Sequence, residues 1–228
     1  MGSPAAPWSS RAEVATLALV LALAIVGAAF LPLTTPAYVR FMVGAVGSAD
    51  RTGLGLDGTL ETAEHVRRFV TDPAAPPLPV TIGGRPAYDE AAVSHLADVR
   101  DVLAPARWLA SGLALAASVW TLVRRRTRAG RAVVASALYG AGWLLLVIGG
   151  VAVLAGAADF DALFAWFHSL FFASGTWLFP EGALLIEVFP LPFWVASGAV
   201  WGLVIISCSA AAVAAAHRIR FTLGNNGV

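Results

Sequence analysis

Four long apolar segments dominate this sequence and restrict what it can fold into. They cover about residues 14–32, 105–123, 132–156 and 188–216, and a helix needs about 20 mostly apolar residues to cross a bilayer core. Because 58% of the chain is hydrophobic and only 13% is charged, a soluble domain would lack the polar surface to cover such a core. The sequence therefore predicts an all-α membrane protein, a single integral membrane domain with four transmembrane helices.

The arginines predict how these helices are oriented. All fifteen basic residues are arginine, and five of them lie in the short loop 124–131. Basic loops stay in the cytoplasm, so we interpret this run as a topology determinant and expect no nucleic-acid partner. The first apolar segment is longer than a typical signal-peptide core and is expected to remain as an anchor. We therefore expect both termini in the cytoplasm, with loops 33–104 and 157–187 on the outer face of the plasma membrane.

The first outer loop is too long for a simple connection. Residues 59–70 have the period of an amphipathic helix, residues 78–88 resemble a short β-hairpin around two glycines, and residues 89–103 resemble a helix leading to the second span. Residues 44–58 show no clear period. The sequence thus predicts an extracytoplasmic cap of two short helices and a hairpin.

The second outer loop contains an unusual aromatic segment. Residues 160–172 are almost wholly apolar and aromatic, yet they include Asp161 and His168. The segment is too short to span a bilayer, and such aromatic residues favour the membrane–water interface. We therefore expect an interfacial aromatic helix before the fourth span.

Two of the four histidines are candidates for chemistry. His168 lies among aromatic residues at membrane depth, where an ionisable group is costly and commonly functional; the alternative is a ring that donates to a backbone carbonyl. His95 lies three residues before Asp98, on one helix face; the alternative is a surface ion network. His65 fits a solvated helix surface, and His217 fits the cytoplasmic end of the fourth span.

The remaining polar residues narrow the chemistry. No serine lies in the setting of an activated nucleophile, and the single cysteine, Cys208, lies in an apolar run. The sequence indicates no third ligand for a metal, and paired haem ligands normally lie within facing spans. We therefore expect no metal and no cofactor, and we favour general acid–base catalysis by histidine. An outward-facing metal or haem protein remains an alternative.

Two strings of residues resemble motifs of a known family. One contains residues 168–172 (HSLFF), then Trp177 and Pro180, then residues 184–190 (LLIEVFP). The other, residues 94–100 (SHLADVR), is similar to a His-x-x-Asp-Val-Lys motif, with Arg100 in place of the lysine. With the four spans and the loop order, the chain resembles the lipoprotein intramolecular transacylase (Lit) family of bacterial membrane proteins. Loop 44–88 matches poorly, and substrate choice could differ there.

The resemblance implies an acyltransferase of the bacterial plasma membrane. Its substrate would be a diacylglyceryl lipoprotein, whose sn-2 acyl chain moves to the lipoprotein's own N-terminal amine at the outer face, among membrane lipids. His168 would be the base, His95, held by Asp98, would stabilise the oxyanion, and Arg100 would bind an ester carbonyl or a headgroup. Substrate-binding roles are expected for Phe171, Phe172 and Trp177. The alternative is a non-enzymatic lipid- or lipoprotein-binding protein of the same fold. The sequence does not predict an oligomeric state.

Overall fold

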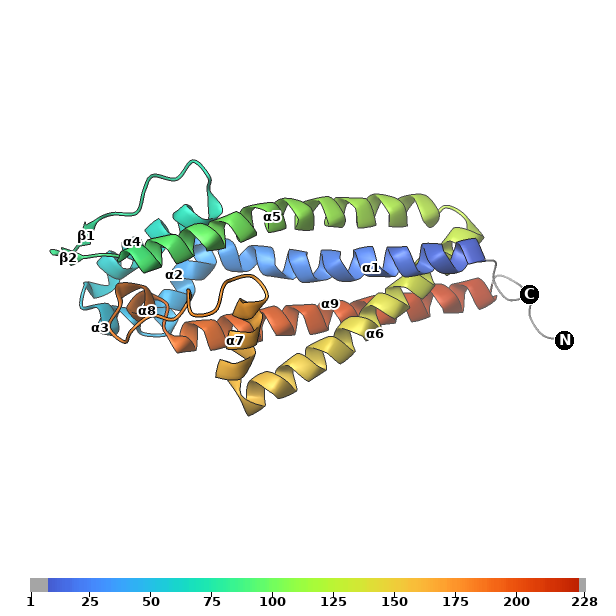
Figure 1. The fold of residues 1–228 in the computed structure, drawn as a ribbon. Coiled ribbons are helices and arrows are strands. Elements are labelled where there is room, and N and C mark those ends of the chain that lie inside the picture. Colours follow the sequence, from blue (N-terminus) through green and yellow to red (C-terminus); the bar gives the residue numbers. More distant parts are fainter. Residues whose placement is uncertain (1–7, 226–228) are drawn as a thin grey trace. The chain divides into compact units, whose positions relative to one another are not determined.

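The computed structural model describes residues 8–225, and most of them are helical (Figure 1). The elements in chain order are α1 (Trp8–Phe30), the 3₁₀ turn η1 (Leu31–Thr34), α2 (Pro36–Ala45), α3 (Ser48–Thr52), α4 (Gly55–Thr71), β1 (Thr81–Ile82), β2 (Arg85–Pro86), α5 (Glu90–Arg124), α6 (Arg128–Ala158), α7 (Phe160–Ser169), α8 (Leu184–Val188) and α9 (Leu191–Asn225). Helices α1, α5, α6 and α9 are long and apolar enough to cross a membrane. The predicted all-α fold with four such helices is confirmed.

The described residues form two compact units. Unit 1 takes the chain up to Ala29, Leu109–Val153 and the residues from Gly202 onward, whereas unit 2 takes Phe30–Trp108 and Leu154–Trp201. Helices α5, α6 and α9 continue from one unit into the other. Each unit has its own buried apolar residues and is described separately.

Small residues bring the helices of unit 1 close together. Gly142 on α6 approaches α9 so tightly that a Cβ atom there would lie 2.8 Å from the Ser209 carbonyl oxygen, and Ala137 and Ala141 are fully buried. Large apolar side chains point outward instead, for example Leu203, which is 66% exposed. Small residues inside and large apolar residues outside are typical of helices packed within lipid.

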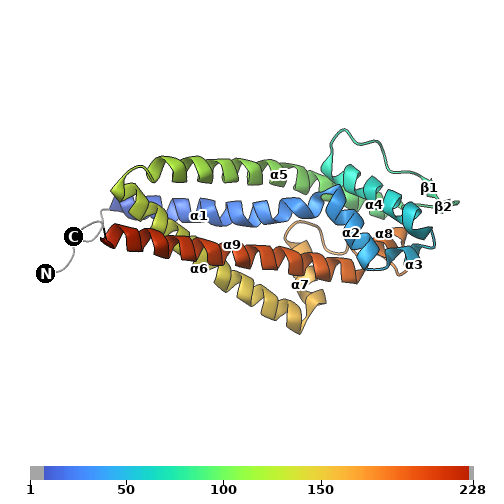
Figure 2. The same ribbon diagram turned by 180° about the vertical axis from the view of Figure 1, so that it is seen from behind.

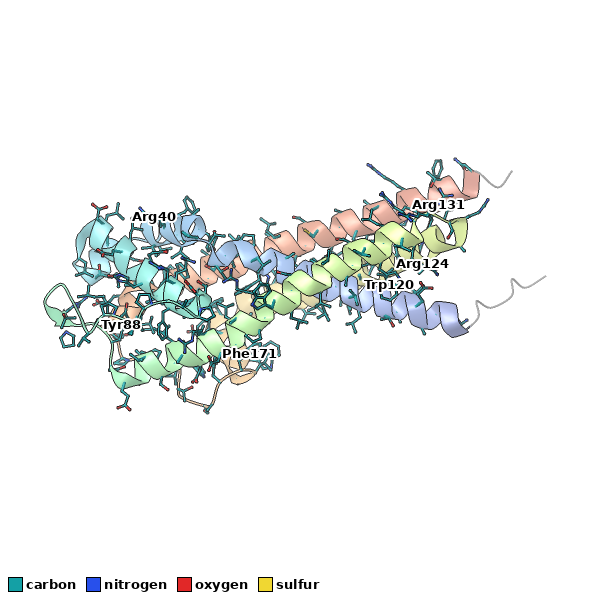
Figure 3. The ribbon with its side chains drawn as sticks, turned by 90° about the horizontal axis from the view of Figure 1, so that it is seen from above. Arg40, Tyr88, Trp120, Arg124, Arg131 and Phe171 are labelled. Atoms are coloured by element: carbon teal, nitrogen blue, oxygen red, sulfur yellow. The ribbon has the colours of Figure 1, made fainter. Side chains whose placement is uncertain are left out.

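Unit 1 also contains an ion pair between helices. Glu13 on α1 accepts from the guanidinium of Arg124 on α5 at 2.5 Å, and the indole N–H of Trp120 donates to the same carboxylate at 3.4 Å. Both donors are labelled in Figure 3. The pair joins the N-terminal part of the first long helix to the C-terminal end of the second.

Three helices of unit 2, α2, α4 and α8, share one apolar core. The buried face of α4 consists of Leu60, Ala63, Val66 and Phe69, which agrees with the expected amphipathic stripe. These side chains pack with residues of α2, the beginning of α5, and α8. Figures 1 and 2 show α2, α3, α4 and α8 gathered at the same end of unit 2.

The expected hairpin is present and is held by a charged contact. Thr81 pairs with Pro86 and Ile82 with Arg85, so the two-residue turn is Gly83-Gly84. Both glycines have positive φ angles, which this turn geometry requires. Arg85 donates to Glu187 on α8 at 2.7 Å and to the carbonyl oxygen of Thr52 at 3.0 Å.

Three expected boundaries differ from the structure. Residues 44–58 are not irregular but contain the end of α2, all of α3 and the start of α4, and α2 begins where Thr35 caps a helix with Pro36 in its first turn. The expected helix 89–103 and the second span form one helix, α5, which continues through Pro105. The fourth long helix begins at Leu191, because Phe189-Pro190 separates it from the short helix α8.

Candidate active site

His168 lies in the last turn of the aromatic helix α7. Asp159 caps this helix by accepting from the backbone N–H of Ala162 at 2.9 Å. The Nδ1 atom of His168 lies 2.9 Å from the carbonyl oxygen of Phe164. Because a carbonyl oxygen can only accept, Nδ1 carries the hydrogen and Nε2 keeps a lone pair when the ring is neutral. The alternative expected for His168, a ring that donates to a backbone carbonyl, is therefore present. It leaves the Nε2 atom able to take up a proton.

His95 lies near the start of α5 and is buried rather than on a surface. It is 8% exposed, and its ring packs against Phe172 at 5.1 Å and Phe179 at 5.6 Å between ring centroids. The His95 and His168 ring centroids are 6.3 Å apart. Two histidines separated by 73 positions in the sequence thus meet within unit 2.

Aromatic rings surround this histidine pair. The ring of His168 lies 4.0 Å from that of Phe164, 4.9 Å from that of Trp177 and 5.8 Å from that of Phe172. Among the described residues, the Nδ1 atom of His95 and the indole N–H of Trp177 are buried without a hydrogen-bond partner. Buried polar atoms are usually paired, so two unpaired ones beside one histidine are notable candidates to contact a substrate.

The environment of His168 favours its neutral form. Burial lowers the pKa of the imidazole below its ordinary value of 6.5, and the hydrogen bond to Phe164 partly opposes this effect. The ring is therefore uncharged near neutral pH. An uncharged imidazole is the form that can act as a base.

Within the described part of the chain, the two expected supporting residues make no hydrogen bond to a histidine ring. Asp98 is exposed, and within the described part of the chain no hydrogen bond joins it to His95. The expected orienting hydrogen bond is therefore not present, although the carboxylate is near enough to act on His95 through its charge. The guanidinium of Arg100 lies 4.9 Å from the ring centroid of Phe69 on α4.

The outward side of the aromatic segment is apolar. Phe171, labelled in Figure 3, is 48% exposed, while Phe172 and Trp177 are half-buried beside the histidines. Trp166, Leu170 and Leu178 are also exposed, each by more than half. Of the three residues expected to bind substrate, Phe171 thus lies at the apolar surface, whereas Phe172 and Trp177 lie against the histidine pair.

The other two histidines are not part of this arrangement. His65 on α4 lies beside Arg68 and the turn at residues 75–78, and His217 packs against Tyr139 in unit 1. Within the described residues, no three His, Cys, Asp or Glu side chains are grouped so that they could hold a metal ion.

Comparison with known proteins gives the family. The model of the family "Lipoprotein intramolecular transacylase Lit" matches residues 14–194, which is well over half of the sequence. The chain belongs to the Lit family. Family membership confirms the expected resemblance and the expected acyltransferase class. No curated protein matches the sequence.

Solved structures of the integral membrane protein Lit from Bacillus cereus have the same fold. One has a TM-score of 0.77 at 16% identity, covering 94% of this chain and 97% of the Bacillus chain. Two others have a TM-score of 0.71 at 15% identity, cover 94% of this chain, and cover 93% and 94% of theirs. In these two, one histidine of the Bacillus protein is replaced, by arginine in one and by alanine in the other.

Two aromatic residues of the candidate site, Phe164 and Phe179, were given no role of their own from the sequence. Phe164 could have been found, because it lies one helical turn before His168 and its carbonyl oxygen is within reach of that ring. Phe179 could not, because it follows an irregular segment and contacts a histidine 84 positions earlier.

Proposed function

We propose that this protein moves the sn-2 acyl chain of a diacylglyceryl-cysteine lipoprotein to the α-amine of the same cysteine, which leaves a lyso-form lipoprotein. The observation that carries the proposal is the meeting of His95 and His168 in an aromatic site with unpaired polar atoms. Family membership supports the reaction class. Donor and acceptor are on one molecule, so holding them together supplies much of the rate acceleration.

His168 would act as the base. An α-amine has a pKa of about 7.7–8.0, so it must first release one proton to water to become the neutral nucleophile. As the neutral nitrogen attacks, the Nε2 atom of His168 takes a second proton from it while Nδ1 keeps its hydrogen bond to Phe164. The amine nitrogen forms a bond to the ester carbonyl carbon, and the protonated ring then gives its proton to the glycerol oxygen as the ester bond breaks. The products are an amide and a free hydroxyl, and no acyl-enzyme is formed.

The oxyanion of the tetrahedral intermediate would be stabilised by donors that have no other partner. A neutral His95 ring always carries one N–H, and Trp177 supplies an indole N–H beside His168. Phe172 and Trp177 form walls that exclude water. Phe171 and the exposed apolar residues near it would accept the acyl chains. Asp98 would act on His95 by its charge, and Arg100 would bind a lipid headgroup at the edge.

The location follows from the arginine distribution. We infer that the arginine-rich loop 124–131 and both termini are cytoplasmic, with the histidine pair on the outer side of a bacterial plasma membrane. Cysteine-accessibility labelling of intact cells tests this: Ser94→Cys should react with an impermeant reagent, and Thr127→Cys should react only after lysis. Labelling in the reverse order would contradict the orientation.

Mass spectrometry of a lipoprotein's N-terminal peptide tests the reaction. Co-expression with the unmodified protein should convert the diacylglyceryl form to the N-acyl lyso form, whereas His168→Ala and His95→Ala should abolish most of the product. His65→Ala, outside the site, is the matched control and should convert normally. Conversion at the unmodified rate by both histidine variants would contradict the proposal. Binding of the lipoprotein without conversion by the unmodified protein would instead indicate the non-enzymatic alternative.

A further inference from the structure

An open hollow in unit 2 lies close to the histidine pair. It is an open groove of about 370 Å³ between the residues that precede α5 and the segment that precedes α8. Its lining consists of Pro86, Ala87, Tyr88, Asp89, Ala92, Pro180, Glu181, Gly182, Ala183, Leu184 and Leu185. None of these residues belongs to the histidine site described above.

The groove and the histidine pair are connected through two short stretches of chain. Ala92 in the groove lies three residues before His95 on α5, so it is about one helical turn away. Pro180 in the groove directly follows Phe179, whose ring contacts His95. Along both stretches of chain, the groove therefore begins within about one helical turn of a residue at the histidine pair.

The chemistry of the groove differs from that of the aromatic surface. Its lining includes the carboxylates of Asp89 and Glu181 and no basic side chain, although Leu184, Leu185 and the prolines make part of it apolar. The hydroxyl of Tyr88, labelled in Figure 3, is a buried donor without a partner among the described residues. The surface at Trp166, Leu170, Phe171 and Leu178 is wholly apolar and exposed.

A lipoprotein substrate also has one apolar part and one polar part. Its diacylglyceryl group is apolar, whereas the polypeptide that follows the lipidated cysteine is polar and carries backbone carbonyl groups. We propose that the groove formed by residues 86–92 and 180–185 binds this polypeptide segment while the acyl chains lie against the aromatic surface. The inference rests on the proposed transacylase function. It adds a binding site for the polypeptide part of the substrate, which the proposed reaction does not locate.

The mixed lining fits a short extended peptide. Carboxylates favour a segment with positive charge, the Tyr88 hydroxyl can donate to a peptide carbonyl oxygen, and the apolar residues can contact small side chains. Arg85 and Glu187 hold the hairpin side of the groove to α8, so its walls are fixed before binding. A fixed site loses less conformational entropy on binding.

The test compares two substrates that differ only in the polypeptide arm. One is a diacylglyceryl-cysteine pentapeptide, and the other is diacylglyceryl-cysteine amide, which has no peptide. Full-length protein in lipid nanodiscs should have a higher kcat/KM for the pentapeptide. Ala183→Phe fills the groove. It should lower the kcat/KM for the pentapeptide, divided by that for the amide, about tenfold, mainly by raising the KM for the pentapeptide. An unchanged ratio would overturn the inference.

A matched control separates filling the groove from general damage. Ala91 is exposed on α5 beside Ala92 but does not line the groove. Ala91→Phe should therefore keep the ratio of the unmodified protein. If Ala91→Phe lowered the ratio as much as Ala183→Phe, the groove would not be the binding site.

A charge variant tests the kind of peptide that binds. Glu181→Lys should lower kcat/KM more for a pentapeptide with lysines after the cysteine than for one with glutamates, and the difference should shrink in high salt. Equal effects on both peptides would contradict the role of the groove's charge.

A binding measurement keeps the inference separate from catalysis. A lipopeptide with a photoreactive residue three positions after the cysteine should crosslink to residues 86–92 or 180–185 in the His168→Ala variant. Crosslinks confined to other segments would overturn the inference. If the unmodified protein converted neither substrate but the crosslinks fell in the groove, the proposed reaction would fail while peptide binding stood.

Discussion

The two units of this protein contrast most clearly in their charge. Unit 1 has eight arginines and a single carboxylate, Glu13, whereas unit 2 has seven arginines and thirteen carboxylates. Three of the four histidines belong to unit 2. Unit 1 is built from close helix packing by small residues, whereas unit 2 combines short helices around an apolar core with the aromatic histidine site. The difference separates a unit of closely packed apolar helices from a unit that holds the candidate site.

Combining histidine variants gives the largest expected effect. His95→Ala and His168→Ala should each lower kcat by about 10²–10⁴-fold, and the double variant should be little worse than the more damaging single one, because the two rings act on one transition state. His217→Ala in unit 1 is the control and should keep nearly full activity. Fully multiplicative losses, measured by the rate of lipopeptide conversion, would show that the rings act independently.

Gly142→Ala tests the close packing of unit 1. The new Cβ would lie 2.6 Å from Val213 Cγ2 and 2.8 Å from the Ser209 carbonyl oxygen, so the free energy of unfolding should fall by about 1–3 kcal/mol. Gly150, on the same helix, has no atom within 4 Å of such a Cβ. Gly150→Ala should therefore be neutral or stabilise by up to about 1 kcal/mol. Thermal unfolding in detergent measures both, and equal losses would contradict the packing account.

Glu13→Gln tests the ion pair of unit 1. It removes the charge that faces Arg124, and the pair is partly exposed, with 23% and 37% of the two side chains accessible. We expect a loss of about 1 kcal/mol in the free energy of unfolding, since exposed pairs contribute little. Lipopeptide conversion at saturating substrate should be unaffected. A loss of turnover without a loss of stability would show that unit 1 takes part in the chemistry.

The protonation of His168 in unit 2 should make both the free energy of unfolding and kcat depend on pH. Because burial lowers the pKa of His168 in the fold, the unfolded chain binds the extra proton first as the pH falls. The free energy of unfolding should therefore decrease below about pH 6.5, and His168→Gln should reduce that decrease. In the profile of kcat against pH, the substrate amine should give one limb near its own pKa of about 7.7–8.0, and His168 should give a second limb below about 6.5. A second limb above 6.5 would contradict the buried, neutral base.

Much of the membrane architecture could be predicted from the sequence. The four long apolar segments, the amphipathic period of residues 59–70 and the two glycines of the hairpin all depend on local patterns, and the structure contains each of them. Helix α2 was missed although Thr35-Pro36 is a local start signal. Pro105 suggested a helix boundary that is absent, because the helix continues through it into the second long span.

The candidate site was only partly predictable. His168 and His95 stood out individually, because ionisable groups are rare in so apolar a chain. Their distance of 6.3 Å, the ring of Phe179 against His95 and the unpaired N–H of Trp177 depend on contacts between distant segments. The orienting role expected for Asp98 followed from spacing on a helix, and that spacing did not fix where its side chain points.

The sequence by itself determined that this protein inhabits a membrane and which of its residues can exchange protons near neutral pH. Both properties follow from composition and local period, since the length of an apolar segment and the type of each side chain belong to short stretches of chain. Only the tertiary structure decided that His95 and His168 face one another and that a groove with carboxylates lies next to them. These depend on the packing of α5, α7 and the segment before α8, which no local pattern specifies.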